Sequence, residues 1–483
     1  MADMKTMLDD FTELLSSNEV ISAAKTTTRG FTQTRKISLL DVLLFYTFRS
    51  AETTNKDITS YFSKLEKPKV SKQAMFKALD KTNPDVFPII IRNLAQKFYS
   101  HNDYHTLDGY LVLACDGTKI DLPPTPEMVE RYGGYLSRYV KTKEEVKKPQ
   151  ANCSVLIDVL NHVVLDTLVE PCLTSEIPML FSHMENCEEL LRGRKVILLC
   201  DRYYGSAEFF LYCQLHGYDF VTRAKSYMYK KYVCEIERDG LIEVPFNKAW
   251  YRRMKRDDCR EYAQCLNALS LRVVKNPFEY IRDDIKRKQS ATIIESTYFT
   301  SLESNSFRAA DIVELYHVQR WDNETAFFDI KSHLEVERFN SGKYNIVTNE
   351  IYGKILCFTL CGSLYEAADE KQVTNRSSAG HCARYDYIPN MKYIVDTARA
   401  EHRLMQYLGG CGTKHTEEIW SNYFADMIDD LSRKVVPVRP GRHYKRWGRW
   451  MNAVPTRKFR IDGRRNPPIK KCFNTYGYMT VQK

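Results

Sequence analysis

Residues 110–117 read Tyr-Leu-Val-Leu-Ala-Cys-Asp-Gly, and residues 195–201 repeat the pattern as Lys-Val-Ile-Leu-Leu-Cys-Asp. A short apolar run bounded by polar residues predicts a buried β-strand. The first run stops at Asp116 and Gly117, which predicts a turn, and the second delivers Asp201 at the carboxyl end of its strand. Because chemistry in α/β sheets gathers at the carboxyl ends of strands, both aspartates are candidate functional residues of an α/β domain.

The segments around these two runs alternate between strand and helix. Residues 153–158 and 163–169 flank Asn161-His162, which predicts a β-hairpin. A long amphipathic helix is predicted from about residue 309 to residue 334. The other predicted elements are helices at 178–191, 207–215 and 348–370, strands at 218–223 and 297–301, and a helical region over residues 1–105.

The long helix offers a third acidic side chain. Five of its side chains are spaced by three or four residues and therefore share one face: His317, Arg320, Glu324, Phe328 and Lys331. One acid between basic side chains suits a metal ligand beside phosphate contacts. A surface ion pair produces the same pattern on a helix, and an aspartate after a strand is often only a turn former. The joint arrangement of three acids favours a functional site.

Asp116, Asp201 and Glu324 form a candidate metal site. Neighbouring strands lie about 4.8 Å apart, so two aspartates on them can bridge one cation. Carboxylate oxygens are hard ligands of the kind that Mg²⁺ prefers, and Mn²⁺ can substitute for it. Two such ions, roughly 3.5–4 Å apart, activate an attacking water and stabilise the leaving oxygen of a phosphodiester. The sequence therefore predicts metal-dependent phosphoryl transfer with these three acids as catalytic metal ligands.

The charge of the chain is concentrated at its C-terminal end. The 483 residues carry 71 Lys and Arg against 61 Asp and Glu, a net charge of +10. Residues 431–483 hold 15 of the basic residues and one acid, Asp462, so this basic tail carries +14 and the rest of the chain −4. Hydrophobic residues make up 43% of the chain, which excludes a wholly disordered protein. A near-neutral body with a basic tail indicates a polyanionic partner.

No segment reads as a secretion signal or a membrane span. Residues 1–20 contain several acids and lack the apolar core of a signal peptide. No window reaches the roughly 18 uninterrupted apolar residues that a span requires. The 14 cysteines stand singly without a CxxC pair, which favours reduced thiols over zinc or disulfides. We therefore expect a cytoplasmic protein with no membrane partner.

The three acids lie in motifs that resemble the DDE transposases of the insertion sequence 4 family. The run ending in Asp116-Gly-Thr is similar to the family's first strand. The stretch Asp-Arg-Tyr-Tyr-Gly at residues 201–205 is similar to its Asp-Arg-x-Tyr element. Arg320, Glu324 and Lys331 match the Arg-x3-Glu-x6-Lys portion of its Tyr-Arg-Glu-Lys signature. The resemblance covers nearly the whole chain and is most specific in this third motif.

One position departs from the signature. The family has a tyrosine three residues before the arginine, and here His317 stands three residues before Arg320, with Tyr316 beside it. Either side chain can hydrogen-bond a phosphate. At the C-terminal end, Val-Pro-Val-Arg-Pro-Gly-Arg at residues 436–442 resembles the family's basic element.

The resemblance implies a fold, an activity and a set of partners. The implied fold is a ribonuclease H-like mixed sheet with a β-rich insertion, a helical N-terminal domain and a basic C-terminal region. The implied activity is cut-and-paste transposition, in which Mg²⁺-dependent hydrolysis at transposon ends precedes strand transfer into target DNA. The implied partners are double-stranded DNA (terminal inverted repeats and target) and a second copy of the chain, at a bacterial nucleoid. The residues expected to contact DNA are Lys119, Arg202, Tyr204, Tyr316, His317, Arg320, Lys331, Arg439, Arg442 and Arg446.

Two other functions fit the same residues. A metal-dependent nuclease without strand transfer needs the same three acids, and a catalytically inactive DNA-binding derivative would retain the basic residues. A helical DNA-binding regulator leaves the two strand-Asp runs unexplained. The expected domains are a helical DNA-binding domain at 1–105, the catalytic core at 106–224 and 296–370, the insertion at 225–295, and the C-terminal region at 371–483.

Overall fold

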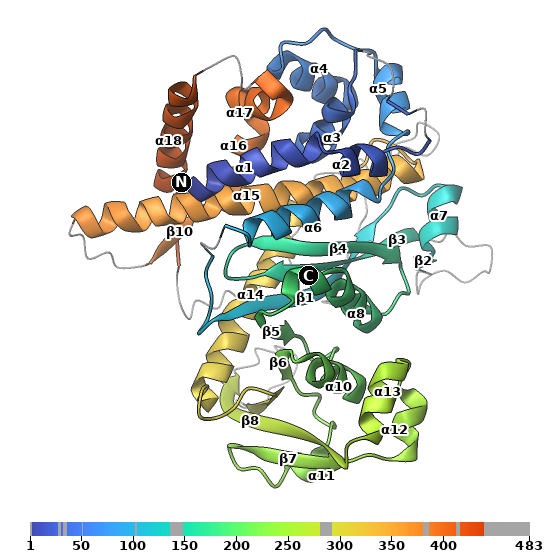
Figure 1. The fold of residues 1–483 in the computed structure, drawn as a ribbon, viewed down its shortest axis with the longest axis vertical. Helices are drawn as coiled ribbons and strands as arrows, with labels where there is room; N and C mark the ends of the chain where they lie inside the picture. The colour runs from blue at the N-terminus through green and yellow to red at the C-terminus, as the bar shows by residue number, and fades with distance from the viewer. Residues whose placement is uncertain are drawn as a thin grey trace, which may run out of the picture.

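A mixed sheet forms the centre of the protein (Figure 1). The structure, a computed structural model, describes residues 2–27, 30–31, 36–50, 52–101, 104–135, 148–280, 292–379, 386–411 and 416–438. Five strands make up the core of the sheet, in the order β4-β3-β1-β5-β6. They are β1 (Tyr110–Asp121), β3 (Lys148–Asp158), β4 (Val163–Pro171), β5 (Lys195–Cys200) and β6 (Asp219–Arg223).

The strand directions define the class of the sheet. β3 runs antiparallel to both β1 and β4, whereas β5 runs parallel to both β1 and β6. An antiparallel three-stranded meander extended by two parallel strands is the arrangement of a ribonuclease H-like core. The predicted fold class is thereby confirmed. Residues 111–115 and 196–200 are buried throughout, as strands covered on both faces must be.

The register of β1 and β5 places the two aspartates next to each other in the sheet. Cys115 pairs with Cys200, so Asp116 and Asp201 follow at equivalent positions on neighbouring strands. The predicted turn at Asp116-Gly117 is wrong, because β1 continues to Asp121. Beyond Cys115, β1 loses β5 as a partner but stays paired with β3, which supplies the hydrogen bonds of a continuing strand.

The insertion extends the same sheet. β9 (Thr292–Thr300) pairs with β6, and β8 and β7 follow it outward, so these strands do not form a sheet of their own. This part of the chain also contains three short helices, which the sequence pattern did not reveal. In Figure 1 it lies at the end of the protein farthest from the N-terminal helices. Its remaining elements are β7 (Asp239–Pro245), β8 (Ala268–Tyr280), α11 (Lys230–Val233), α12 (Lys248–Arg253) and α13 (Asp257–Gln264).

Three helices pack on the core strands. α8 (Glu176–Asn186) contacts β1, β3 and β4, and α14 (Ala309–Ser332) crosses β1, β5, β6 and β8. α10 (Ala207–His216) follows β5 and contacts β6. The predicted long helix is thus present as α14. α14 contains Glu324, so its backbone carries the third predicted acid across the strands that lead to Asp116 and Asp201.

A helical layer covers the β4 side of the sheet. Figure 1 shows α15 (Tyr344–Ala379) running across the protein alongside the other helices of this layer. It contacts α3 (Leu39–Phe48), α18 (Glu417–Arg433) and β4. At Gly353 a Cβ would stand 2.6 Å from the carbonyl oxygen of Tyr46 in α3, so glycine allows the two helices to touch. At Gly362 a Cβ would stand 2.4 Å from the carbonyl oxygen of His162. A second glycine therefore allows α15 to contact the turn between β3 and β4.

Ser38 begins α3 as the sequence predicts. Its hydroxyl accepts a hydrogen bond from the Asp41 amide at 3.1 Å, and the Asp41 carboxylate accepts one from the Ser38 amide at 2.9 Å. This capping box satisfies two backbone donors at once. None of the helices described is long and apolar enough to cross a bilayer. The other elements are α1 (Ala2–Leu15), α2 (Asn18–Ala23), α4 (Thr54–Lys64), α5 (Lys72–Leu79), α6 (Val86–Phe98), α7 (Pro126–Tyr132), α9 (Glu188–Leu191), α16 (Met391–Ala400), α17 (His402–Gln406), a π-helical turn (Tyr407–Cys411), β2 (Gly134–Tyr135), β10 (Tyr387–Pro389) and β11 (Val435–Pro437).

Candidate active site

Asp116 and Asp201 lie at the point where the pairing of β1 and β5 ends. Both residues are half-buried. The Gly117 amide donates to Asp116 Oδ1 at 2.8 Å, and the Tyr203 amide donates to Asp201 Oδ1 at 2.6 Å. The Thr222 hydroxyl on β6 donates to the carbonyl oxygen of Asp201 at 2.9 Å. These local bonds fix the direction of both carboxylates.

The turn after β5 corrects one expected DNA contact. Tyr204 is fully buried, with its hydroxyl 3.7 Å from the Cys115 sulfur, so its side chain is not available to DNA in this structure. The tyrosine on the surface is Tyr203, which is 46% exposed. Lys225 donates to the carbonyl oxygens of Tyr203 and Gly205 at 3.1 and 3.2 Å, which holds the turn in place. Sequence reasoning missed Tyr203 because it occupies the unspecified position of the Asp-Arg-x-Tyr element.

Arg202 remains compatible with its predicted role. It is exposed and lies next to Asp201, so its guanidinium can reach a DNA phosphate. Lys225, by contrast, is partly withdrawn from solvent. Burial lowers its pKa, although the negative charge of Asp201 opposes that shift.

One lysine joins α14 to β1, and a second joins β1 to the segment after β4. Lys331 donates to the carbonyl oxygen of Lys119 at 2.8 Å, and the Lys119 ammonium donates to the carbonyl oxygen of Cys172. Both lysines are half-buried. The end of α14 is thereby fixed three residues along β1 from Asp116. Their contacts with DNA phosphates stay predictions.

The remaining predicted residues fall into two groups. Tyr316 is buried, with its ring centre 5.0 Å from that of Tyr298, so it is not placed to contact DNA and that expectation is corrected. The α14 backbone is helical through residues 317–325, but their side chains lie outside what the structure describes. The contacts of Glu324, Arg320 and His317 therefore stay predictions. Arg439, Arg442 and Arg446 lie outside the described residues.

Glu176 is an acid of this site that sequence reasoning missed. It is the first residue of α8, and a Cβ placed on Gly117 would stand 2.8 Å from its carboxylate carbon. Burial raises the pKa of Glu176, and the negative charge of Asp201 raises it further, against the opposing charge of Lys119. A glutamate at a helix start usually serves only the helix dipole. No local sequence pattern indicated that Glu176 lies beside Gly117 of β1, because this contact forms only in the folded protein.

A buried hydrogen-bond chain supports the backbone at Asp116. His183 Nδ1 lies 2.8 Å from Asp166 Oδ2, and His183 Nε2 lies 3.0 Å from the Ser154 hydroxyl. That hydroxyl donates to the carbonyl oxygen of Asp116 at 3.3 Å. The order Asp-His-Ser is that of a hydrolase triad, but Ser154 is fully buried and no substrate can reach it. These hydrogen bonds therefore support the backbone of the sheet at Asp116.

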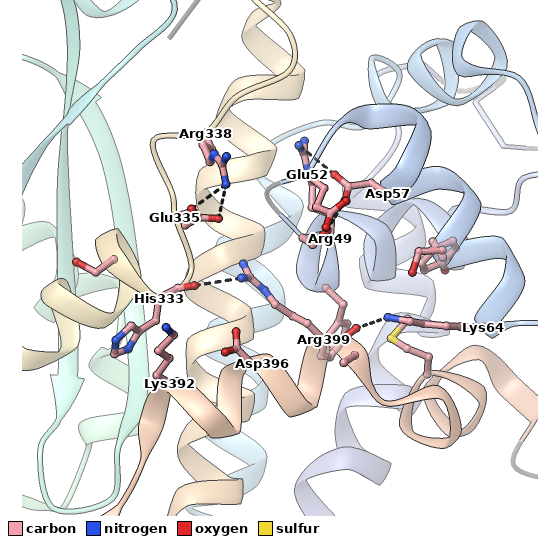
Figure 2. Close-up of a pocket in the computed structure, with 17 residues that line it drawn as sticks. Arg49, Glu52, Asp57, Lys64, His333, Glu335, Arg338, Lys392, Asp396 and Arg399 are labelled. Atoms are coloured by element: carbon pink, nitrogen blue, oxygen red, sulfur yellow. Dashed lines mark hydrogen bonds and ion pairs between the residues drawn. The ribbon is translucent and has the colours of Figure 1, made fainter. Parts of the chain in front are cut away.

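The described cavity lies away from the aspartates. It has a volume of about 640 Å³ and lies between the N-terminal helices, the end of α14 and α16 (Figure 2). Arg49 beside it is buried, 3.5 Å from Asp57 and ion-paired with Glu350 of α15. Arg399 donates to the carbonyl oxygen of His333 at 3.1 Å. The Arg399 contact joins α16 to the end of α14, and we assign the cavity no part in the chemistry.

The fold and the aspartate pair define a ribonuclease H-like protein, and comparison with known proteins gives the family. The family described as "Transposase DDE domain" matches residues 107–360, more than half of the chain. The chain belongs to this family of DNA transposases. Among solved structures it is similar to the piggyBac transposase in a cryo-EM synaptic complex with hairpin DNA, at 10% identity and a TM-score of 0.41, with 90% of this chain and 86% of that chain covered. No curated protein matches the chain.

Transposase DDE domains typically use divalent metal ions. Within the described residues, no three His, Cys, Asp or Glu side chains gather closely enough to hold a metal ion. The donors that are present still fit such an ion, because Mg²⁺ is commonly held by one or two carboxylates together with water and substrate phosphates. Asp116 and Asp201 supply two carboxylates on neighbouring strands. A third can come only from an element beside them.

Proposed function

We propose that this protein is a transposase of an insertion sequence that cuts DNA at the transposon ends and joins the freed 3′ ends to target DNA. The observation that carries the proposal is the register of β1 and β5, which places Asp116 and Asp201 at equivalent positions in a transposase DDE domain. The cofactor we propose is Mg²⁺, held by these two residues and Glu324.

The residues of the chain have separate roles in this reaction. A bound divalent cation would activate the attacking water and stabilise the leaving oxygen. Asp116 and Asp201 orient their carboxylates through backbone amides, so little reorganisation is needed when DNA arrives. Arg202, Lys119 and Lys331 bind the phosphates that flank the cut and set the register of the DNA.

The partners we propose are double-stranded DNA and a second copy of the chain. Residues 431–483 carry a local charge of +14, which favours the DNA backbone over an uncharged or acidic partner. Two transposon ends have to be cut and joined in one event. A dimer that holds one end in each active site meets that need.

A strand-transfer assay tests the proposal. The protein is incubated with Mg²⁺, a duplex carrying the inverted repeats that flank its gene, and a supercoiled target plasmid. We expect cleavage at the repeat boundary and covalent joining of the end to the plasmid, with both products absent for Asp201→Asn. Cleavage without joining would identify a nuclease. Binding to the repeats without cleavage would identify an inactive DNA-binding derivative.

A further inference from the structure

We propose that α5 lies in the major groove of the bound DNA and reads its sequence through Gln73. This inference rests on the proposed function, because it assigns to α5 the recognition of the DNA that the aspartates cut. The surface belongs to the helical layer and not to the sheet that carries the aspartates. Figure 1 shows α5 at the edge of this layer, at the opposite end from α18.

α5 presents an exposed polar face. Gln73 and Lys77 are exposed and stand four residues apart, so they share one side of the helix. Ala74 beside Gln73 is exposed too, and its small side chain lets the wall of a groove come close to the helix. The major groove of B-DNA, about 12 Å wide, admits an α-helix. The shape of this face therefore fits base edges in that groove.

The protein holds the opposite side of α5 in place. Met75 and Leu79 are buried, and the Tyr46 hydroxyl donates to the carbonyl oxygen of Leu79 at 2.9 Å. The Ser71 hydroxyl accepts a hydrogen bond from the Ala74 amide at 3.2 Å and caps the first turn. Because α5 is fixed at both ends, its exposed side chains keep a defined position relative to a bound duplex.

The charge around this face has one sign. Residues 67–79 contain four lysines and no acid. Lys67 lies 2.5 Å from Asp41 and is neutralised by it. The other three lysines are exposed and make no ion pair within the part of the chain that the structure describes: Lys69, Lys72 and Lys77. Phosphates border the groove in every DNA sequence, so these ammonium groups suit the backbone on either side of it.

The competing explanation is that α5 only keeps the surface soluble. Other lysines of the helical layer are paired with acids, since Lys97 donates to Glu13 at 2.6 Å and Lys56 lies 3.1 Å from Glu52. The lysines around α5 lack such partners, which favours an anionic ligand. The Gln73 side-chain amide makes no hydrogen bond among the described residues. An amide offers one donor and one acceptor to N7 and the amino group of adenine, so Gln73 matches an A·T pair.

Single base-pair replacements in the duplex that carries the inverted repeats test the proposal. The affinity of the full chain for each duplex is measured by fluorescence anisotropy. For the wild type we expect an A·T pair whose replacement weakens binding about 5- to 150-fold. Gln73→Ala should lose discrimination at that pair and keep it at the others. Lys77→Gln should weaken binding to every duplex alike and reduce the slope of log K against log salt by about 0.9.

Gln264→Ala is the matched control. Gln264 is an exposed glutamine at the end of α13, in the insertion, and its replacement should preserve the discrimination at every base pair. The thermal midpoint of Gln73→Ala should equal that of the wild type, because the side chain is exposed.

The outcomes distinguish this inference from the proposed function. If the wild type cuts the duplex while Gln73→Ala discriminates between base pairs as the wild type does, the assignment of Gln73 is overturned and the proposed function stands. If the wild type neither cuts the duplex nor binds it more tightly than a scrambled duplex, the proposed function and the role of α5 both fail.

Discussion

The two tyrosines after Asp201 show how far the role of a residue depends on which way it faces. Tyr204 packs beneath β1, and Tyr203 projects to the surface beside Arg202. A motif match assigns a role to a sequence position, but burial decides whether that side chain can touch a partner. We therefore assign any DNA contact of this turn to Tyr203 and Arg202.

Alanine substitutions separate the two tyrosines. Tyr204→Ala should lower the free energy of unfolding by about 3–5 kcal/mol, because it removes a large ring from a packed interior. Tyr203→Ala should change it by less than about 0.5 kcal/mol and should weaken DNA binding. Urea denaturation and fluorescence anisotropy with an end-containing duplex measure the two effects. The opposite pattern would mean that Tyr204 leaves the core to reach DNA.

Asp166 makes the stability of the core dependent on pH. Burial alone would raise the pKa of Asp166, but its bonds to His183 and Asn186 and the charge of Arg92 outweigh burial and hold the pKa below its ordinary value. A carboxyl group of this kind stabilises the fold above the unfolded-state pKa of about 3.9 and loses that contribution as the pH falls through the folded-state value.

Asp166→Asn should accordingly be less stable than the wild type at neutral pH, and the difference should shrink as the pH falls below about 4. Urea denaturation at a series of pH values measures it. A difference that stays constant over the whole series would show that the Asp166 charge does not stabilise the fold.

At the scale of elements, a buried ion-pair network joins three helices of the helical layer. Arg49 at the end of α3 pairs with Glu350 of α15 and lies 3.5 Å from Asp57 of α4. Lys354 of α15 donates to the carbonyl oxygen of Arg49 at 2.6 Å. Figure 2 shows Arg49 and Asp57 at the cavity wall, beside the segment that follows α14. The network therefore links α3 and α4 to α15, which is not the helix on which Glu324 lies.

Arg49→Met should destabilise the fold by about 3–5 kcal/mol, because it removes the guanidinium that faces two buried carboxylates. Lys56→Met is the matched control. Its exposed pair with Glu52, at 3.1 Å, should contribute no more than about 1 kcal/mol. The shift of the urea midpoint measures both changes. Equal effects of the two variants would show that the network does not hold the layer in place.

At the scale of the whole molecule, charge and chemistry occupy different parts of the chain. The aspartates lie in a near-neutral body, and the basic tail begins beyond α15. If the tail contacts DNA phosphates, the triple variant Arg439→Gln, Arg442→Gln and Arg446→Gln should reduce the slope of log K against log salt by up to about 2.7, or 0.9 for each lost contact. Anisotropy titrations at several salt concentrations measure the slope. An unchanged slope would show that these arginines do not contact DNA.

Much of the fold could be predicted from the sequence, because its signals were local. A recognisable pattern within a few residues marks each of these predicted features: the two strand-Asp runs, the hairpin, the Ser38 cap and α14. Three features depend on partners far away in the chain. β1 continues past Asp116 because of β3, Tyr204 is buried by β1, and Glu176 reaches Gly117 only after α8 has packed on the sheet. A single sequence carries no local signal for such contacts.

Asp201→Cys tests most directly whether the aspartate pair binds the cation that cleavage requires. A thiolate is a poor ligand for Mg²⁺, and Mn²⁺ accepts it better. Cleavage of the end-containing duplex is compared in the two metals for the wild type, Asp201→Cys and Asp201→Ala. We predict that both variants are inactive in Mg²⁺ and that only Asp201→Cys recovers cleavage in Mn²⁺. Wild-type cleavage by Asp201→Ala in Mg²⁺ would contradict the assignment of Asp201 to the active site.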